Sequence, residues 1–489
     1  MPAPRLLLPA LVLWSSAAVL VVELVALRLL APYLGLTLET NTLVIGIALA
    51  AIAYGSWAGG RAADRTPPQR LLMPLLLVSG AVVALTPFVV RASAGVAGGA
   101  LLVPVAAVTI LVPGAALSAV TPIVTKLRLE SLERTGEVVG RLSGLSTLGA
   151  IAGTVVTGFV LISRVPVGVI LVGLGASLVL LGLLVGPWSA VWRPAAAAAL
   201  IVVGGGAGVA SGVGGCDAET VYHCAEVLPD PDREGGRLLV LDGVRHSYVD
   251  LEDPTTLDFA YVRALAAAVE TGYPDRAEDA PLAAHHVGGG GLTLPRWLAQ
   301  VRPGSTSTVS EIDRGVVGVD RELLGLETSP ALQVRVEDGR TALADLEPAS
   351  LDLVVGDAFG GVSVPWHLTT REALREVRAS LAPGGRYAAN LIDHGPLAFA
   401  RAEVATLRTV FEHVAVAADP AVLDRADGGN LVVLASDDAL EVAAWEAALA
   451  ERDTGWAVLQ GDALDAWVGD AEVLTDDYAP VDQLLTPYG

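Results

Sequence analysis

The sequence predicts an N-terminal all-α transmembrane bundle followed by a C-terminal α/β domain with a Rossmann-like sheet. Three observations carry this prediction. The 489 residues are 53% hydrophobic with a mean hydropathy of +0.57, which is too apolar for a soluble protein. The long apolar runs precede Cys216, whereas all but six of the 53 acidic residues follow it. After Cys216, short apolar strands alternate with helices, so we expect two domains, 1–215 and 216–489.

Seven apolar runs of about 20 residues occur before residue 216, and this length matches the hydrocarbon thickness of a bilayer. The runs cover residues 9–30, 42–60, 71–90, 96–120, 142–162, 165–185 and 194–215. The last run is rich in glycine and is the least hydrophobic, so we expect six or seven transmembrane helices and a lipid bilayer as a partner. Within the runs, Gly55 with Gly59 and Gly149 with Gly153 have the spacing that lets two helices pack closely.

Basic residues gather in alternate loops between these runs, and they orient the predicted bundle. One loop carries Arg61, Arg65 and Arg70, and the next but one carries Lys126, Arg128, Arg134 and Arg141. The positive-inside rule places these loops and the N-terminus in the cytoplasm of a multi-pass cell-membrane protein. The acidic domain then lies outside the cytoplasm if all seven runs cross, and inside if the glycine-rich seventh does not.

Three residues in or beside the predicted bundle have open roles. Cys216 and Cys224 form either a short-loop disulfide or two unrelated thiols, and their spacing is not that of a metal site. A disulfide persists only in an oxidising compartment, so it favours the outside placement. Glu23 lies in the first run, where a carboxylate is costly and is usually paired or functional. We expect it to stabilise helix packing rather than to serve transport.

The acidic excess of the second domain limits its partners. A negative surface repels phosphate backbones, which argues against nucleic acid and suits a cationic substrate or simple solubility. The domain begins with RLLVLDGV, residues 237–244, which predicts a β-hairpin with its turn at Asp242-Gly243. Seven strands with helices between them follow and predict a doubly wound parallel sheet. They are expected at 284–287, 308–312, 333–336, 351–355, 386–391, 413–417 and 431–434.

The clearest site signal is a run of glycines between the first of these strands and a helix expected at 295–301. It contains Gly288, Gly289, Gly290 and Gly291. Glycines let a ligand lie against bare backbone, and the amides at the helix start point at it; a tight surface turn is the alternative. The next strand ends with Glu311 and Asp313, where a Rossmann-type fold places the acid that binds the ribose hydroxyls.

Carboxylates also stand at the ends of the next two strands, and together these features resemble a known family. Asp338 precedes Gly339, and Asp357 lies in VVGDAFGG. With LDGVRHS, Phe259 and Tyr261, GGGGLTLPR, EID and the closing TDDYAPVDQLL, the region of about 222–488 resembles the spermidine synthases, or polyamine aminopropyltransferases. The ending is similar to that of membrane-fused members. The resemblance implies the methyltransferase-type version of the Rossmann-like fold.

This resemblance implies an enzyme that transfers an aminopropyl group from decarboxylated S-adenosylmethionine to a polyamine such as putrescine, without a metal. By it, Glu311 holds the ribose, Asp338 lies on the adenine side, and Asp357 helps to deprotonate the attacking amine. The other residues implied at the site are Gly288, Gly289, Gly290, Asp313 and Gly339 around the co-substrate, and Tyr261 and His246 around the polyamine. The resemblance is compatible with a homodimer.

The sequence departs from the family pattern at three positions. Gly291 replaces the aspartate of the usual GGGDGG, Gly360 replaces a second aspartate three residues after Asp357, and His246 replaces a glutamine. The lost carboxylates are those expected to bind the aminopropyl ammonium and the polyamine. Two alternatives therefore stand: a methyltransferase that uses S-adenosylmethionine itself, and a non-catalytic nucleoside-binding domain attached to a membrane transporter or scaffold. Further candidate bases are His285, His286, His367 and His394.

Overall fold

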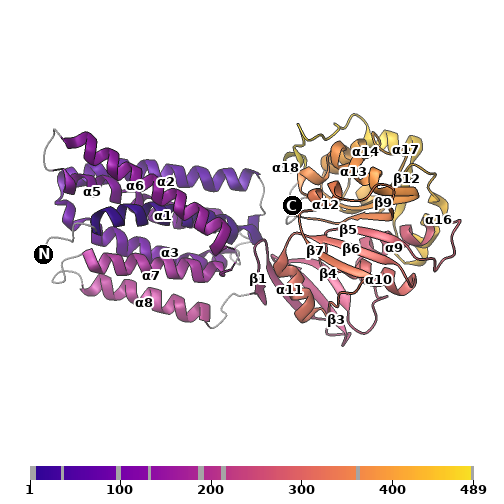
Figure 1. Cartoon of the computed structure of the whole chain (residues 1–489), viewed down its shortest axis with the longest axis horizontal. Coiled ribbons are helices and arrows are strands. Elements are labelled where there is room, and N and C mark those ends of the chain that lie inside the picture. Colours follow the sequence, from indigo (N-terminus) through magenta and orange to yellow (C-terminus); the bar gives the residue numbers. More distant parts are fainter. Residues whose placement is uncertain are drawn as a thin grey trace. The chain divides into compact units, whose positions relative to one another are not determined.

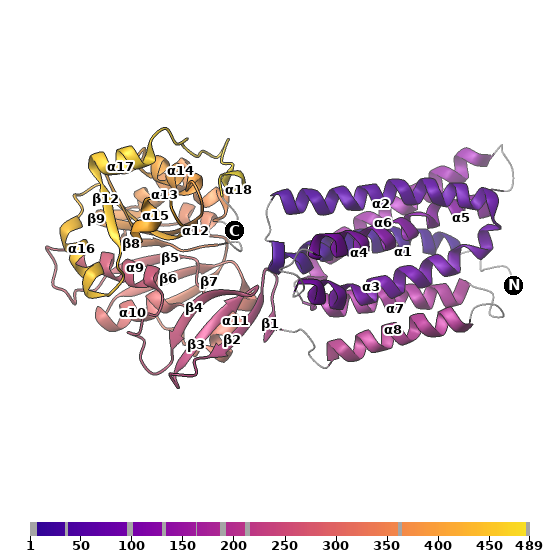
Figure 2. The ribbon, with the colours of Figure 1, turned by 180° about the vertical axis from the view of Figure 1, so that it is seen from behind.

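The computed structural model describes residues 7–34, 38–94, 101–129, 134–162, 164–185, 192–210, 216–359 and 364–485. The chain divides into two compact units, Met1–Cys224 and Ala225–Gly489, which Figure 1 shows and Figure 2 shows from behind. The first unit consists mainly of helices, and the second contains a large sheet between layers of helices. The division falls after the expected boundary between residues 215 and 216, because the segment that follows Cys216 packs on helices of the first unit.

The first unit is a helical bundle. Its described α-helices are α1 (Leu7–Leu34), α2 (Leu38–Arg65), α3 (Leu72–Ala94), α4 (Leu102–Ser118), α5 (Val120–Arg128), α6 (Thr135–Val156), α7 (Val167–Val185) and α8 (Trp192–Ala210). Six segments of the described chain are long and apolar enough to cross a membrane, in agreement with the first six predicted runs. They are Leu7–Leu30, Thr40–Arg65, Pro68–Ser93, Leu102–Arg128, Thr135–Leu161 and Val167–Val185.

Two pairs of helices in this unit pack at glycines. A Cβ atom on Gly55 of α2 would lie 2.1 Å from the carbonyl oxygen of Ala115 in α4. A Cβ atom on Gly149 of α6 would lie 2.1 Å from the carbonyl oxygen of Leu13 in α1. The second glycine of each pair, one turn further along, is in similarly close contact. Larger side chains do not fit at these positions, so the glycine spacing brings the helices together as predicted.

The helix α8, which contains the glycine-rich seventh run, lies along α3. Ala198 near its start packs with Met73 near the start of α3. Near its end, a Cβ atom on Gly208 would lie 2.9 Å from the ring of Phe88, in the second half of α3. The two helices are therefore parallel and cover the same depth of the bundle. The apolar stretch Ala196–Gly208 lies within α8 and is not one of the six candidate spans.

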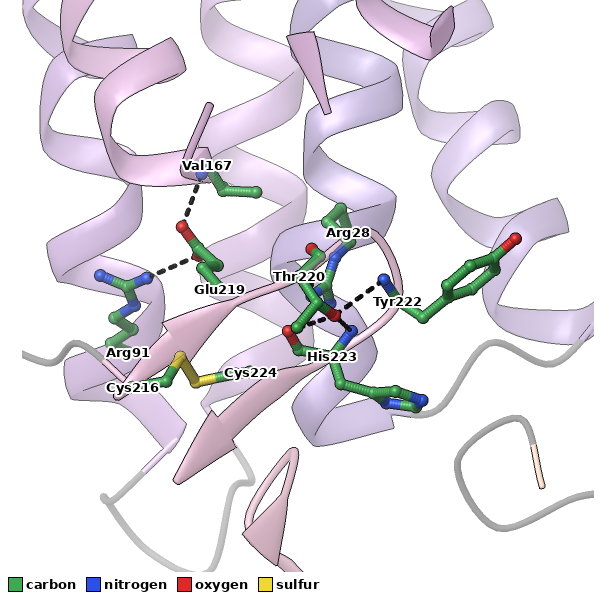
Figure 3. Close-up of a disulfide and its surroundings, with 9 residues drawn as sticks. All are labelled: Arg28, Arg91, Val167, Cys216, Glu219, Thr220, Tyr222, His223 and Cys224. Atoms are coloured by element: carbon green, nitrogen blue, oxygen red, sulfur yellow. Dashed lines mark hydrogen bonds and ion pairs between the residues drawn. A yellow bond between two sulfur atoms is a disulfide. The ribbon is translucent and has the colours of Figure 1, made fainter. Parts of the chain in front are cut away.

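The segment after α8 contains a disulfide. Cys216 and Cys224 are joined, with 5.4 Å between their Cα atoms, on either side of the short strand β1 (Ala218–Glu219). Figure 3 shows this bridge and the residues around it. Inside the closed loop, the Thr220 N–H donates to the His223 carbonyl oxygen at 2.7 Å. Of the two alternatives that the sequence leaves open, the structure has the disulfide.

The loop closed by this disulfide is fixed to one end of the bundle (Figure 3). Glu219 accepts a hydrogen bond from the Val167 N–H at the start of α7 (2.7 Å) and forms an ion pair with Arg91 near the end of α3 (3.3 Å). Arg28, toward the end of α1, donates to the Thr220 carbonyl oxygen (3.1 Å). Because α3 begins at a basic loop and ends near Arg91, the disulfide loop lies at the end of the bundle opposite to the basic loops.

A small sheet has its strands in the sequential order β1-β2-β3-β4. Its longer strands are β2 (Cys224–Pro229), β3 (Gly236–Leu241) and β4 (Val244–Asp250). β3 and β4 pair antiparallel on either side of Asp242 and Gly243. The φ angles of these two residues, 54° and 79°, are those that a tight Asp-Gly hairpin turn requires.

The large sheet has eight strands in the order β12-β10-β11-β9-β8-β5-β6-β7. They are β5 (Ala283–Val287), β6 (Thr306–Glu311), β7 (Leu332–Val336), β8 (Leu351–Gly356), β9 (Leu381–Asp393), β10 (His413–Ala418), β11 (Gly429–Ser436) and β12 (Ala457–Gln460). The strands β5 to β11 correspond to the seven segments that the sequence predicts as strands, and only the segment 308–312 extends beyond its strand, by one residue at the end of β6.

The prediction of a parallel, seven-stranded sheet is wrong at one edge. β12 is an eighth strand, and the pairs β9–β11, β10–β11 and β10–β12 are antiparallel. A parallel pair needs a crossover of about a dozen residues or more. The connection from β10 to β11 contains only the one-turn helix α15 (Pro420–Leu423), which forces an antiparallel return. β12 is a strand of four residues at the edge of the sheet, and the sequence analysis predicts no strand there.

Helices cover both faces of this sheet. They are α9 (Ala260–Thr271), α10 (Thr293–Val301), α11 (Arg314–Leu323), α12 (Gly339–Ala344), α13 (Arg371–Ser380), α14 (Ala398–Leu407), α16 (Val442–Glu451), α17 (Gly461–Val468) and α18 (Val481–Leu484). α9, α10 and α16 share a core with Leu353 and Val355, whereas α13, α14 and α17 share one with Val354. Successive residues of β8 thus enter opposite cores, which explains why the strands read as continuous apolar runs.

Candidate functional site

The carboxyl ends of four parallel strands meet at one edge of the sheet and form the candidate site. Backbone pairing places Val287, at the end of β5, beside Ser310 of β6 and Gly356 of β8. Glu311, at the end of β6, pairs with Val336 of β7. The glycine loop and the carboxylates singled out in the sequence therefore come from neighbouring strand ends, where open α/β sheets bind ligands.

The glycine loop, residues 288–291, is held tightly at its start. Gly288 has a φ of 97° and donates its N–H to the Ser310 carbonyl oxygen (2.9 Å). The Asp357 N–H donates to the Val287 carbonyl oxygen (2.9 Å). A Cβ atom on Gly288 would lie 2.2 Å from the carbonyl oxygen of Asp357, so only glycine fits there. The loop thus runs directly against the backbone of the predicted catalytic residue.

Glu311 joins the second strand to this loop. Its Oε2 accepts a hydrogen bond from the Gly289 N–H (2.8 Å), and its Oε1 accepts one from the Asp313 N–H (2.8 Å). The side chain is only partly buried. A carboxylate has about four lone-pair sites, so these two bonds do not exhaust its capacity as an acceptor. The arrangement suits a group that accepts hydrogen bonds from ribose hydroxyls beside the glycine loop.

Asp313 and Gly339, two residues predicted to bind the co-substrate, have structural roles in the fold. Asp313 is fully buried and accepts a hydrogen bond from the Gly315 N–H (2.8 Å), which makes it the N-cap of α11. A Cβ atom on Gly339 would lie 2.5 Å from Cγ1 of Val287, so this glycine lets α12 pack on β5. An acid or a glycine after a strand also suits the start of a helix, and the sequence pattern does not separate the two roles.

Asp338 caps the next helix and faces a histidine. Its Oδ1 accepts a hydrogen bond from the Arg340 N–H (2.9 Å), and its Oδ2 lies 3.2 Å from Nε2 of His367. The Asp338 side chain is 35% exposed, so it is accessible at the end of β7. His367, one of the candidate bases, is therefore a partner of Asp338.

Asp357, at the end of β8, lies in a chain of polar side chains. Nδ2 of Asn390 donates to its Oδ1 (2.9 Å), and Nδ2 of Asn430 donates to Oδ1 of Asn390 (2.9 Å). The Tyr261 hydroxyl also donates to the Asp357 carboxylate. The four side chains come from α9, β9, β11 and the end of β8, so only the folded sheet brings them together.

Burial and these partners set the protonation states. Burial raises the pKa of Asp357 from 3.8 to about 6, and the hydrogen bonds from Asn390 and Tyr261 limit that rise. Burial and the charge of Asp357 raise the pKa of Tyr261 well above its usual 10.0. At neutral pH, Asp357 is therefore mainly a carboxylate and Tyr261 is a phenol that donates to it. A carboxylate with such a pKa is an effective proton acceptor.

The histidines on β5 are buried and neutral. Nε2 of His286 lies 3.2 Å from Oγ of Ser307, and burial lowers its pKa to about 3. Nε2 of His285 lies 3.2 Å from Oγ of Ser310, and burial lowers its pKa to about 4. Burial also lowers the pKa of His394. The two strand histidines are consistent with a structural role.

The strand β4 lies against the glycine loop. Its side chains occupy the space beside Gly291, which is one of the three positions at which this sequence departs from the family pattern. Oγ of Ser247 accepts a hydrogen bond from the Gly291 N–H (3.0 Å). A Cβ atom on Gly291 would lie 2.9 Å from Cγ2 of Val249 and 3.0 Å from Cβ of Ser247. Nδ1 of His246 would lie 3.2 Å from a Cβ atom on Gly290. An aspartate at position 291 therefore does not fit without a shift of β4.

Sequence reasoning missed Asn390, Asn430 and Ser247. The available signal for the two asparagines is an amide within the apolar strand segments RYAANLI and NLVVLA, because a buried amide needs a partner. Gly360, the other departure from the family pattern, lies outside the described residues. Within the described ranges, there is no group of three His, Cys, Asp or Glu side chains arranged to hold a metal ion.

The chain is similar to curated proteins named polyamine aminopropyltransferase. It is 33% identical over 133 residues to the protein of Vibrio vulnificus and 31% identical over 158 residues to that of Halorhodospira halophila. These alignments cover 26% and 31% of this chain. They cover 42% and 52% of the two relatives, so the chain spans about half of their length. No family model matches the chain.

A solved structure gives a longer match. The crystal structure of a probable spermidine synthase from Corynebacterium glutamicum is 30% identical and has a TM-score of 0.51. The match covers 55% of this chain and 98% of that protein.

Proposed function

The chain belongs to the spermidine synthase, or polyamine aminopropyltransferase, family, and we propose that it transfers an aminopropyl group from decarboxylated S-adenosylmethionine to a polyamine such as putrescine. The observation that carries the proposal is the environment of Asp357. Its carboxylate lies beside the glycine loop, has a pKa of about 6 and is held by Tyr261 and Asn390.

Asp357 is the proposed general base. In the reaction, a neutral amine of the acceptor attacks the carbon next to the sulfonium of the donor. A C–N bond forms, the C–S bond breaks with its electron pair leaving on sulfur, and methylthioadenosine departs. The attacking nitrogen then loses a proton, which the Asp357 carboxylate accepts. Carboxylates also suit the two cationic substrates, because they stabilise positive charge on both.

The other site residues are proposed to bind the substrates. Glu311 holds the ribose hydroxyls, and Asp338 lies on the adenine side at the next strand end. The glycine loop supplies bare backbone for the nucleoside to lie against. Tyr261 orients Asp357 and, with His246 from β4, lies on the polyamine side. These assignments rest on the positions of the side chains at the strand ends.

We also propose that the protein is a multi-pass membrane protein with its N-terminus in the cytoplasm and its C-terminal domain on the opposite side. The basic loops orient the bundle. α8 runs parallel to α3, and the disulfide loop, residues 216–224, lies at the end away from the basic loops. A disulfide persists in an oxidising compartment, which agrees with that side. The reaction then needs donor and acceptor on that side.

A second candidate function is methyl transfer from S-adenosylmethionine, and one observation favours it. The position of the family's aspartate, Gly291, is closed by Ser247 and Val249. A donor whose tail does not need that carboxylate therefore fits this loop better than one whose tail does. The nucleoside site is the same for both donors, so the products separate the two functions.

The test is product analysis with the purified full chain in detergent. The protein is incubated with decarboxylated S-adenosylmethionine and putrescine, and in parallel with S-adenosylmethionine and putrescine. We expect spermidine and methylthioadenosine in equal amounts from the first mixture, as identified by mass spectrometry. A methylated acceptor and S-adenosylhomocysteine from the second mixture, with no spermidine from the first, would establish the second candidate instead.

A further inference from the structure

The helical unit contains a cavity of about 690 Å³ whose lining combines apolar side chains with hydroxyl groups and one ion pair. It lies among α1, α2, α5 and α6, with Ser118 at the end of α4 also in its lining. The residues that α2 and α6 contribute recur every three or four positions, so they lie on one face of each helix. On α2 this face runs from Ser56 through Gly60 to Asp64, and on α6 it runs from Ser143 to Thr147. Side chains of α2 and α6 that line the cavity are also exposed, so it opens at the surface of the unit between these helices.

The cavity is unusually rich in hydroxyl groups for an apolar bundle. Eight serine and threonine residues line it. Ser16 and Ser146 bond to each other (2.8 Å), and Thr125 donates to a backbone carbonyl one turn earlier (2.9 Å). The hydroxyls of Ser56 and Ser118 make no hydrogen bond within the described part of the chain, and the same holds for those of Thr121 and Ser143. These hydroxyls are therefore available to bind a polar ligand.

A single ion pair completes the lining. Nζ of Lys126, at the end of α5, lies 2.8 Å from Oδ1 of Asp64, at the end of α2. Both side chains are more than half exposed, so the pair adds little stability and is readily exchanged for a ligand. Because the two charges cancel, the cavity suits a ligand with no net charge, rather than a polyamine or a free anion.

The helix that carries Lys126 continues directly from α4. α4 ends at Ser118 and α5 begins at Val120, and Ala119 between them keeps a helical backbone (φ −69°, ψ −18°) and donates its N–H to the Ala115 carbonyl oxygen (3.1 Å). On the two sides of the cavity, α2 packs closely on α4 at Gly55 and α6 packs closely on α1 at Gly149.

We propose that this cavity binds a zwitterion that carries a primary ammonium and a phosphate, as in a phosphoethanolamine group. The ligand exchanges with the ion pair: Asp64 accepts hydrogen bonds from the ammonium, and Lys126 donates to the phosphate. The free hydroxyls donate to the remaining phosphate oxygens, since a phosphate offers several acceptors to a lysine and its neighbours. The group belongs either to a membrane lipid that enters between α2 and α6 or to a free headgroup.

The test uses probes that differ in the ammonium. Binding to the purified full chain is measured by calorimetry for glycerophosphoethanolamine, glycerophosphocholine and glycerol phosphate. Native mass spectrometry of the protein from nanodiscs measures phosphatidylethanolamine against phosphatidylcholine. We expect the ethanolamine compound to bind about tenfold or more tightly than the choline compound, either among the free headgroups or among the lipids. The reason is that a quaternary ammonium cannot donate hydrogen bonds to Asp64. Preference only among the lipids identifies the lipid as the source, whereas preference among both identifies the headgroup itself.

Variants test the residues. Asp64→Asn removes the ammonium partner and Lys126→Gln the phosphate partner, and each is expected to weaken binding about tenfold to a hundredfold. Ser56→Leu removes a hydroxyl and places a larger apolar side chain in the cavity, and it is expected to weaken binding without a change of charge. The control is Glu137→Gln, which breaks the exposed ion pair of Arg134 and Glu137 (2.9 Å) outside the cavity and should leave binding unchanged.

Three results overturn the proposal. One is the failure of the folded wild-type protein to bind either the ethanolamine headgroup or its lipid. Another is equal binding of the choline compounds or of glycerol phosphate. The third is unchanged binding in both Asp64→Asn and Ser56→Leu, which together exclude the cavity even if Lys126→Gln fails to fold.

Discussion

The side-chain NH₂ group of Asn390 donates a hydrogen bond of 2.9 Å to the Asp357 carboxylate. The side-chain oxygen of Asn390 faces away from Asp357 and accepts a hydrogen bond from Asn430. The second bond fixes the amide, so its NH₂ group must face the carboxylate. The ionised form of Asp357 is the better acceptor for this donor. The pair of asparagines therefore holds Asp357 in the orientation and the charge state that a general base needs.

Replacing Asn390 by leucine is expected to raise the pKa of Asp357 further above 6. The hydrogen bond stabilises the ionised carboxylate, so its loss disfavours ionisation and leaves burial unopposed on that side. A hydrogen bond to a charged group is worth roughly 1.5–3 kcal/mol, which corresponds to about one to two pH units. The acidic limb of kcat/KM against pH should move upward by that amount. A limb that stays in place or moves downward would show that Asn390 does not support the base.

Replacing Glu311 by alanine is expected to weaken nucleoside binding. Glu311 bonds to the Gly289 N–H and is proposed to hold the ribose, so the change removes charge-assisted hydrogen bonds and loosens the loop. The loss is about tenfold to a hundredfold in affinity for methylthioadenosine, measured by calorimetry. Glu322→Ala, on the exposed side of α11, is the matched control. If methylthioadenosine and S-adenosylhomocysteine bind neither the wild type nor the variant, the nucleoside site does not exist.

Replacing Asp357 by asparagine is expected to stabilise the protein above pH 6. The pKa of Asp357 is higher in the folded chain, about 6, than its ordinary 3.8, so folding favours the protonated form. Between these values stability falls as pH rises, and above pH 6 the ionised carboxylate costs at most about 3 kcal/mol. Thermal unfolding should therefore show a higher Tm for the variant at pH 8 and equal values near pH 4. Destabilisation at pH 8 would contradict the raised pKa.

The sequence alone predicts those parts of the site that depend on a single strand end. A strand, a glycine run and a helix are consecutive, so the loop at Gly288 is visible locally, as is Glu311 at the end of the next strand. The glycine spacing at Gly55 and Gly149 is local in the same way. Each of these features follows from neighbouring residues and backbone geometry.

The parts that the sequence does not predict depend on contacts between distant strands. Asn390 and Asn430 reach Asp357 only because β11 and β9 pair antiparallel, and this pairing was predicted as parallel. Ser247 reaches the glycine loop only because β4 folds against it. A helix cap such as Asp313 and a ligand-binding acid such as Glu311 have the same residue type at the same strand end, so packing alone separates them.

Topology is open to a direct test with reporter fusions. We expect fusions after Arg70 and Arg141 to report the cytoplasm, because they lie in basic loops, and a fusion at Ala218 to report the opposite side. The two cysteines should react with a membrane-impermeant maleimide in intact cells only after reduction, since they form a disulfide. A cytoplasmic signal at Ala218 would mean that α8 does not cross, and the reaction would then draw on cytoplasmic substrates.

The most direct test of the proposed reaction is the turnover of Asp357→Asn with decarboxylated S-adenosylmethionine and putrescine. Asparagine keeps the size and polarity of the side chain but cannot accept the proton. If Asp357 is the general base, spermidine formation falls by roughly 10²–10⁴, whereas the affinity for methylthioadenosine hardly changes. Turnover of Asp357→Asn close to that of the wild-type protein, measured as spermidine released per unit time, would contradict the account.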